Sequence, residues 1–163
     1  MKRIRFPSKL PVITCAASLA HHGMLGSVRE IKLQDIDLTS VPSDHLISLV
    51  SSVTVRVGIQ NVSGCLVTIL DSVKSKELCI TRQSLGSEET RALVRAMETR
   101  VEGLWLTQDI RGLIEYSGRG KCKKMECYGE VVARYRDQLM TWAKNRSWAV
   151  TFESFQYLII KRL

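Results

Sequence analysis

The sequence predicts an α/β fold: a solenoid of about six parallel strands on the concave side with helices on the convex side. The first observation behind this prediction is a pair of apolar residues, two positions apart, that recurs at intervals of 24, 23, 26, 21 and 25 residues. Recurrence at such a period is typical of repeat arrays. The second observation is that a stretch with helical spacing follows each pair, and alternating strands and helices imply a parallel sheet. The six pairs are Ile31/Leu33, Val55/Val57, Leu78/Ile80, Leu104/Leu106, Met125/Cys127 and Val150/Phe152.

A helix over about residues 8–22 is predicted before the first pair, within an N-terminal cap of residues 8–23. Pro11 lies near its start and Gly23 just past its end, which are the positions that these residues favour. The same segment allows another interpretation. Basic residues, an apolar run over 10–20 and the small residues Ser18 and Ala20 also describe a secretory signal peptide with its cleavage site. The run is too short to cross a bilayer, so the sequence predicts no membrane span.

Residues 28–146 are predicted to hold the repeats. In each strand the two paired residues point to one side and the residue between them points to the other. Ser87 is a suitable N-cap for one of the helices, and Glu88 and Glu89 suit the positive end of its dipole. The helices are expected over residues 43–50, 63–73, 87–99, 113–116 and 135–142.

The segment 147–163 is predicted to close the array as a capping strand or hairpin. A terminal repeat exposes one side of its core and therefore needs a cap. Trp148, Phe155 and Tyr157 are expected to supply that cover. A strand that docks a partner is the alternative interpretation. With this cap, residues 1–163 form a single domain.

The spacing inside the units resembles that of a leucine-rich repeat. The first unit follows the frame L-x-x-L-x-L-x-x-N-x-L with Val28, Ile31, Leu33, Ile36 and Leu38. Helical return segments resemble the ribonuclease-inhibitor-like class. The phrases SLAHHGMLGSV, SEETRALVRAME and ARYRDQLMTWAKNR resemble the C-terminal repeats of animal NACHT–LRR (NOD-like) receptors. This resemblance, which covers about residues 8–157, implies the sensing or autoinhibitory part of a cytoplasmic receptor of innate immunity.

The chain departs from that family at the position usually held by asparagine or cysteine. A regular ladder of asparagine amides between the turns is therefore not expected. The repeats also vary in length, and nothing matches the phosphate-loop pattern of a NACHT ATPase. The residues at the asparagine position are Ile36, Gln60, Gln83, Asp109, Glu130 and Phe155.

The formal net charge is +8, and the clearest internal basic cluster is a loop at 119–124. Such a cluster attracts nucleic acid, anionic surfaces or acidic proteins, although a solvated turn is the plainer interpretation. The five cysteines include no CxxC motif, which favours reduced thiols in an intracellular protein. The basic loop residues are Arg119, Lys121, Lys123 and Lys124.

No catalytic, metal or cofactor site is predicted, and the chain is not expected to be an enzyme. His21 and His22 are adjacent, so on a helix they diverge by about 100° and cannot form the i,i+4 pair that binds metal. The loop around Gly118 and Gly120 lacks both the GxGxxG and the Walker patterns.

The residues between the paired positions form the candidate binding face. Trp105 stands out, because tryptophan, tyrosine and arginine dominate interface hot spots. A register slip of one residue would instead place Trp105 in the core. The candidate ligand-binding residues are Lys32, Arg56, Cys79, Trp105, Glu126 and Tyr128.

The predicted function is a non-enzymatic protein-recognition module that binds a protein ligand or an intramolecular partner domain. The alternative is a basic domain that binds nucleic acid or an anionic surface through Lys32, Arg56 and the basic loop. The acidic residues Glu30, Glu77 and Glu126 disfavour the alternative, since they would repel a phosphate backbone.

Overall fold

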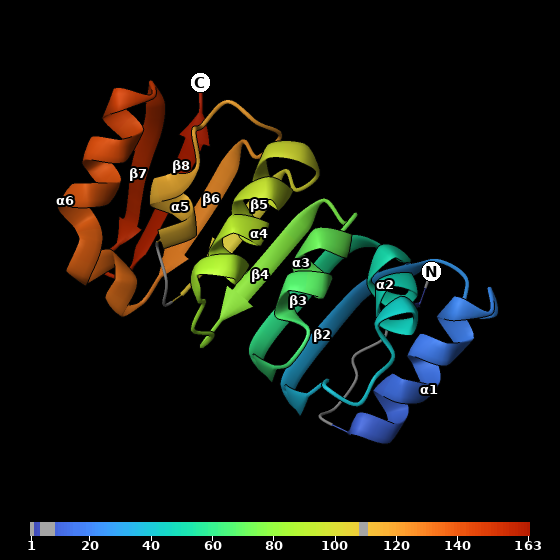
Figure 1. The fold of residues 1–163 in the computed structure, drawn as a ribbon. Coiled ribbons are helices and arrows are strands. Elements are labelled where there is room, and N and C mark those ends of the chain that lie inside the picture. The colour runs from blue at the N-terminus through green and yellow to red at the C-terminus, as the bar shows by residue number, and fades with distance from the viewer. Residues whose placement is uncertain (1, 4–8, 108–110) are drawn as a thin grey trace.

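The structure, a computed structural model, describes residues 2–3, 9–107 and 111–163. Strands and helices alternate along these residues until the last two elements, which are both strands (Figure 1). Their order is β1 (Lys2–Arg3), α1 (Leu10–His21), β2 (Val28–Asp37), α2 (Ser43–Ser51), β3 (Val53–Ser63), α3 (Leu66–Ser72), β4 (Glu77–Thr81), α4 (Ser87–Thr99), β5 (Gly103–Leu106), α5 (Arg111–Glu115), β6 (Lys124–Tyr128), α6 (Glu130–Asn145), β7 (Trp148–Ser154) and β8 (Tyr157–Arg162).

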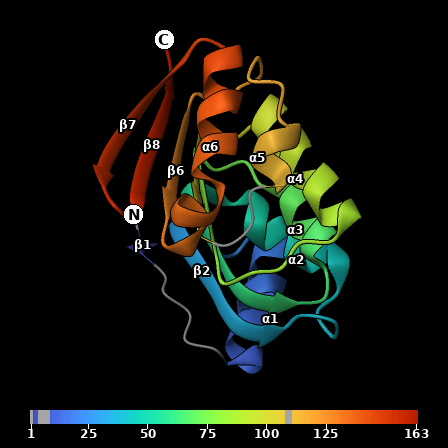
Figure 2. The same ribbon diagram turned by 90° about the vertical axis from the view of Figure 1, so that its left-hand side faces the viewer.

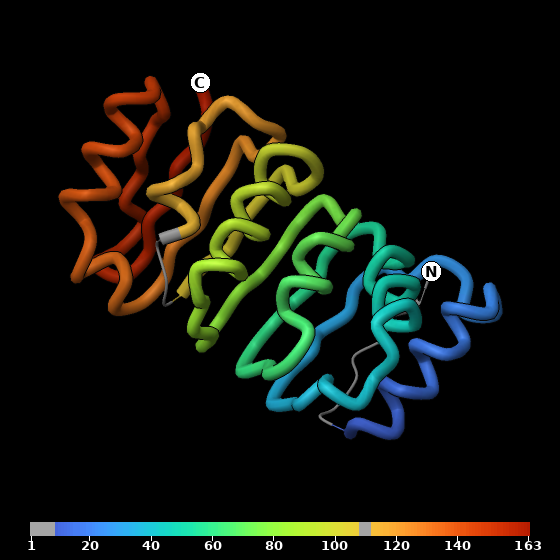
Figure 3. Tube along the Cα trace, viewed as in Figure 1, coloured from blue at the N-terminus to red at the C-terminus, as the bar shows by residue number. Residues whose placement is uncertain are grey.

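The described strands form one sheet in the order β1-β2-β3-β4-β5-β6-β8-β7, which does not close on itself. All pairs from β1 to β6 are parallel, whereas β8 pairs antiparallel with both β6 and β7. The prediction of an α/β fold with a mostly parallel sheet is therefore confirmed. Figure 3 shows the chain passing unit by unit from one end of the sheet to the other.

The helices lie together on one face of the sheet (Figure 2). Apolar residues that alternate along the strands point to this face and meet the apolar stripes of the helices. Leu33, Leu78 and Leu104 are fully buried there, as are Leu46 of α2 and Leu93 of α4. A single core runs through these residues from α1 to β8. Among the described residues, none of the helices is both long enough and apolar enough to span a bilayer.

The register predicted for β3 is wrong by two residues. Val57 and Ile59, not Val55 and Val57, lie beside the buried pair of β2 and the buried pair of β4. Apolar residues occupy four alternate positions from 53 to 59, so the strand fits two frames equally well. A slip of two residues preserves the side of the sheet to which every side chain points.

The prediction of a sixth parallel strand at Val150/Phe152 is also wrong. These residues lie in β7, at the edge of the sheet, and Phe152 is 37% exposed. The neighbours of the pair Met125/Cys127 are Ile160 and Leu158 of β8, which are fully buried. Segment 147–163 is thus a β-hairpin whose second strand lies next to β6.

Aromatic residues pack against this hairpin on the face of the sheet that the helices cover. Tyr116, Trp142 and Trp148 pack together with ring centroids 5.2–6.3 Å apart. The indole Nε1 of Trp142 donates to the Tyr116 carbonyl at 3.1 Å. From β8, Arg162 donates to the carbonyls of Gly120 and Cys122 at 2.6 and 2.7 Å. These contacts attach the final strand to the loop that leads into β6.

Ser87 is the first helical residue of α4 rather than its N-cap, which is Gly86. The Glu89 carboxylate accepts a hydrogen bond from the Gly86 backbone N–H at 2.7 Å. This bond is one half of a capping box and needs no side chain at the cap position.

Candidate functional site: the open face of the sheet

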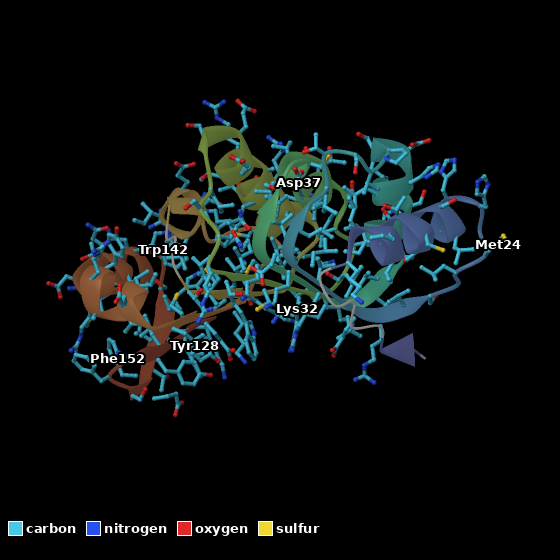
Figure 4. All side chains as sticks on the ribbon, turned by 90° about the horizontal axis from the view of Figure 1, so that it is seen from below. Met24, Lys32, Asp37, Tyr128, Trp142 and Phe152 are labelled. Atoms are coloured by element: carbon cyan, nitrogen blue, oxygen red, sulfur yellow. The ribbon has the colours of Figure 1, made fainter. Side chains whose placement is uncertain are left out.

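The face of the sheet opposite to the helices carries the candidate binding residues. Figure 4 shows Lys32 and Tyr128 on this side, pointing away from helices α2 to α4. We call it the open face. The strand pairing arranges its residues in rows that run across the sheet. The central row reads Lys32, Gly58, Cys79, Trp105, Glu126 and Ile159, and the preceding row reads Glu30, Arg56, Glu77, Gly103, Lys124 and Lys161.

Arg56 lies on the open face, one row earlier than the sequence predicted, because of the two-residue shift in β3. Gly58 takes its place in the central row. A Cβ atom at Gly58 would lie 3.4 Å from the Cγ atom of Lys32, so the exposed Lys32 side chain lies close over this glycine.

Arg56 connects two strands through its guanidinium group. Its Nε and Nη2 atoms donate to one carboxylate oxygen of Glu77 at 2.8 and 2.6 Å. Its Cζ atom lies 4.7 Å from the ring centroid of Trp105, which is a cation–π distance. Both Arg56 and Glu77 keep about a third of their side-chain surface exposed, at 33% and 36%. The guanidinium is therefore held in place and still accessible.

Trp105 is the first of three aromatic rings that contact one another in series across three strands. It is half-buried on the open face, whereas its neighbours Leu104 and Leu106 are buried on the other side. Its ring centroid lies 5.7 Å from that of Tyr128 on β6. Tyr128 in turn stacks on Tyr157 of β8 at 4.4 Å, with the ring planes only 10° apart. These separations lie in or near the range that favours aromatic pairs.

Tyr157 belongs to this series of rings, although the sequence suggested only a capping role for it. Its place beside Tyr128 depends on the insertion of β8 between β6 and β7. The alternation of Tyr157 with Leu158 was the signal that could have assigned Tyr157 to the open face.

Glu126 is the buried acid of the open face, with only 3% of its surface exposed. The ammonium group of Lys124 lies 2.6 Å from one of its carboxylate oxygens, and the Tyr128 hydroxyl donates to the other at 3.3 Å. A buried carboxylate is costly without such partners. Glu126 therefore fixes the positions of Lys124 and Tyr128 more than it offers a free contact to a ligand.

Burial raises the pKa of the Tyr128 hydroxyl above its ordinary value, and Tyr157 and the Glu126 charge act in the same direction. Burial also raises the pKa of the Cys79 thiol, and this outweighs the opposing effect of the Arg56 charge. Both groups are thus protonated near neutral pH. Tyr128 can donate a hydrogen bond, and Cys79 offers a thiol rather than a reactive thiolate.

The four residues of the predicted basic loop do not act as one cluster. Lys124 is in β6 and is paired with Glu126 on the open face. Lys123 lies 3.6 Å from a carboxylate oxygen of Glu102. Arg119 and Lys121 are exposed on the segment between α5 and β6. The positive charge is therefore divided between the open face and the segment that precedes β6, and Glu102 and Glu126 neutralise part of it.

The glycines beside this loop have a packing role. A Cβ atom at Gly120 would lie 2.3 Å from the Cα atom of Glu98, at the end of α4. Gly118 has a φ of +79°, a conformation that glycine adopts without strain. The backbone N–H of Lys121 donates to the Glu98 carbonyl at 2.9 Å. The glycine-rich segment thus lets the chain pass close to α4.

The chain was compared with protein-family models, with curated proteins and with solved structures, and none of the three comparisons finds a match.

Proposed function

We propose that this chain is a protein-recognition domain of the leucine-rich-repeat type. It binds a protein ligand, or a partner domain of the same polypeptide, through the open face of its sheet. One observation carries the proposal. Arg56, Trp105, Tyr128 and Tyr157 form a continuous series of cation–π and ring–ring contacts from β3 through β5 and β6 to β8, on the open face. Arginine, tryptophan and tyrosine are the residues that most often dominate binding energy at interfaces.

The contact between Gln83 and Val62 supports the leucine-rich-repeat part of the proposal. Gln83 occupies the position usually held by asparagine. Its buried amide accepts a hydrogen bond from the Val62 N–H at 2.7 Å and donates one to the Val62 carbonyl at 3.0 Å. It therefore joins two successive units through the backbone, as an asparagine ladder does. Its counterparts in the preceding units are Ile36 and, because of the two-residue shift in β3, Val62 instead of the predicted Gln60. The apolar side chains of Ile36 and Val62 cannot form such bonds.

The finer part of the proposal is a solenoid that serves as the sensing or autoinhibitory region of a cytoplasmic NACHT–LRR-type receptor. Two features support it: the helical phrases described above and the sequential order of strands β1 to β6. Helices are wider than strands, so helices on one face would curve such an array and make the open face concave.

The ion pairs of the open face disfavour the nucleic-acid alternative. Arg56 is bound to Glu77, and Lys124 to Glu126. These acids neutralise the cations that a phosphate backbone would need. The remaining face offers aromatic rings and hydrogen-bond donors, which suit a protein surface better.

The test combines quantitative cross-linking with an open-face variant. Wild type, the double variant Trp105→Ala/Tyr128→Ala and the helix-face control Arg91→Ala are compared by mass spectrometry of cross-linked cell extracts. A partner captured by wild type and by the control is expected to be lost from the double variant. Removal of one hot spot costs about 2 kcal/mol, which is about thirtyfold in affinity. Circular dichroism checks that all three proteins are folded.

Equal capture of every partner by wild type and the double variant would contradict this proposal. Fluorescence anisotropy with duplex DNA addresses the alternative. Binding that weakens steeply with salt, and that is lost in a Lys32→Ala/Lys121→Ala variant, would favour a nucleic-acid binder instead.

A further inference from the structure

The three histidines of the chain gather at one place, between α1 and α2. His21 ends α1, His22 follows it directly, and His45 lies in the first turn of α2. The rings of His21 and His45 stack with their centroids 4.4 Å apart. Sequence reasoning excluded a metal site because His21 and His22 diverge on one helix. The packing of α1 against α2 supplies the second imidazole from another helix (Figure 1).

A carboxylate completes a set of three metal-binding groups. His21, Asp44 and His45 each offer a ligand atom, and these three atoms lie within 4.8 Å of one another. The Nε2 atom of His21 lies 3.6 Å from the Oδ2 atom of Asp44. Two imidazoles with one carboxylate are a donor set that suits borderline divalent ions such as Zn²⁺.

Hydrogen bonds outside this set orient the ligand atoms. The Ser48 hydroxyl donates to the Asp44 carbonyl at 2.9 Å, so its oxygen is left to accept a hydrogen bond from the Nδ1–H group of His21, 3.5 Å away. In that tautomer the Nε2 lone pair faces Asp44. The other oxygen of Asp44, Oδ1, accepts a hydrogen bond from the His45 backbone N–H at 3.0 Å. This bond leaves the Oδ2 atom on the side of His21. Such partners commonly hold metal ligands in place.

The site is also accessible to an ion from solution. The side chains of His21 and Asp44 are 36% and 65% exposed. With three protein ligands, a tetrahedral ion keeps its fourth position for water.

We propose that His21, Asp44 and His45 form a binding site for a divalent transition-metal ion of the Zn²⁺ class, which links α1 to α2. This proposal is independent of the function proposed for the open face, because the two sites share no residue.

Isothermal titration of the tag-free protein with ZnCl₂ tests the site. Wild type is expected to bind one ion in a saturable manner. The variants His21→Gln and His45→Gln should each weaken binding by about tenfold or more, since even the loss of a residue that only orients a ligand costs 10- to 100-fold. Ser48→Ala is expected to weaken binding about tenfold without changing the stoichiometry.

Two matched controls lie near the site, one at the C-cap of α1 and one within this helix. His22→Gln removes the one histidine outside the ligand set, and Cys15→Ser removes the exposed thiol of this helix. Both variants are expected to bind Zn²⁺ as wild type does. All of these substitutions are at exposed or half-buried positions, and circular dichroism verifies that each variant is folded.

Three results would overturn the proposal: no saturable binding to wild type, equal affinity in wild type and His45→Gln, or a loss in His22→Gln or Cys15→Ser as large as that in His45→Gln. Co²⁺ provides a second readout. Its absorption spectrum should lack a thiolate charge-transfer band, and the appearance of that band would also refute the assigned ligands.

Discussion

The two ends of the sheet are stabilised by different kinds of side chain. At the β2–β3 end, strands of 10 and 11 residues bury aliphatic residues such as Leu33 and Ile59 in the core. At the other end, β5 and β6 have only 4 and 5 residues. There the core depends on Tyr116, Trp142 and Trp148, with Arg162 bonded to the backbone beneath them.

This difference separates a repeated part from a unique one. Aliphatic residues at alternate positions are interchangeable among strands, so the β2–β3 end can be built from a recurring pattern. The aromatic end depends on contacts that occur once: an indole hydrogen bond to a carbonyl, ring packing and an arginine from the final strand. The two ends are therefore expected to be energetically distinct.

The largest effect is expected for Trp142→Ala at the aromatic end. It removes a buried indole that is only 4% exposed, and it should lower the free energy of unfolding by about 3–5 kcal/mol. Urea denaturation measures this loss. Hydrogen exchange should show reduced protection in β7 and β8 with β2 and β3 retained. Met140→Ala, on an exposed part of the same helix, is the control and should change stability by less than about 0.5 kcal/mol. A uniform loss of protection over the whole sheet would show that the two ends are not energetically distinct.

The next effect concerns Gln83, which joins two units of the repeated part. Gln83→Leu leaves the Val62 N–H and carbonyl without partners in a buried place, at a cost of about 1–3 kcal/mol. Thermal and urea denaturation measure it. Gln138→Leu on the exposed surface of α6 is the matched control. If both substitutions had the same effect, the amide would not contribute to the cohesion of the units.

A pH effect is expected in β6, at the aromatic end. Burial raises the pKa of the Cys127 thiol from its ordinary 9.0 to about 12. Above pH 9 the unfolded chain releases this proton and the folded chain keeps it. The free energy of unfolding therefore falls progressively as the pH rises toward 12. The slope is at most about 1.4 kcal/mol per pH unit. Cys127→Ala should flatten the alkaline fall of the unfolding free energy, whereas Cys15→Ala, at an exposed site, should leave it unchanged.

The smallest effect is expected for the ion pair between α3 and α4. Arg95 donates to both carboxylate oxygens of Asp71 at 3.0–3.2 Å, but the two side chains are 49% and 41% exposed. A double-mutant cycle with Arg95→Ala and Asp71→Ala should give a coupling below about 1 kcal/mol. The coupling should decrease in about 1 M NaCl. A larger, salt-independent value would show that the helices contribute to the joining of units as the strands do.

The sequence predicted the elements of the repeated part because burial there imposes period-two alternation. Its error in β3 arose from apolar residues at four alternate positions, which leave the register open by two residues. At the aromatic end the pattern failed for a different reason. Val150 and Phe152 match the period, but Leu158 and Ile160 fill the place next to β6, and sequence spacing does not reveal which strand of a hairpin lies inside.

The candidate site likewise contains residues that the sequence could assign and contacts that it could not. Trp105 and Arg56 could be assigned to one face from alternation alone, and the two-residue slip left that face unchanged. The stacking of Tyr157 on Tyr128 could not be predicted, because it depends on antiparallel pairing of β8. The approach of His45 to His21 likewise depends on how two helices pack, which no local motif records.

The inversion of β7 and β8 bears on how the chain is made. Translation delivers β7 before β8, yet β8 lies between β7 and β6. The edge of β6 therefore stays unpaired while β7 leaves the ribosome, and β7 has no partner until β8 has emerged. Unpaired edges are sites of wrong pairing and aggregation during synthesis. The interval between the synthesis of β7 and that of β8 therefore leaves two strand edges unpaired at once, and a pause in translation just after β7 would lengthen it.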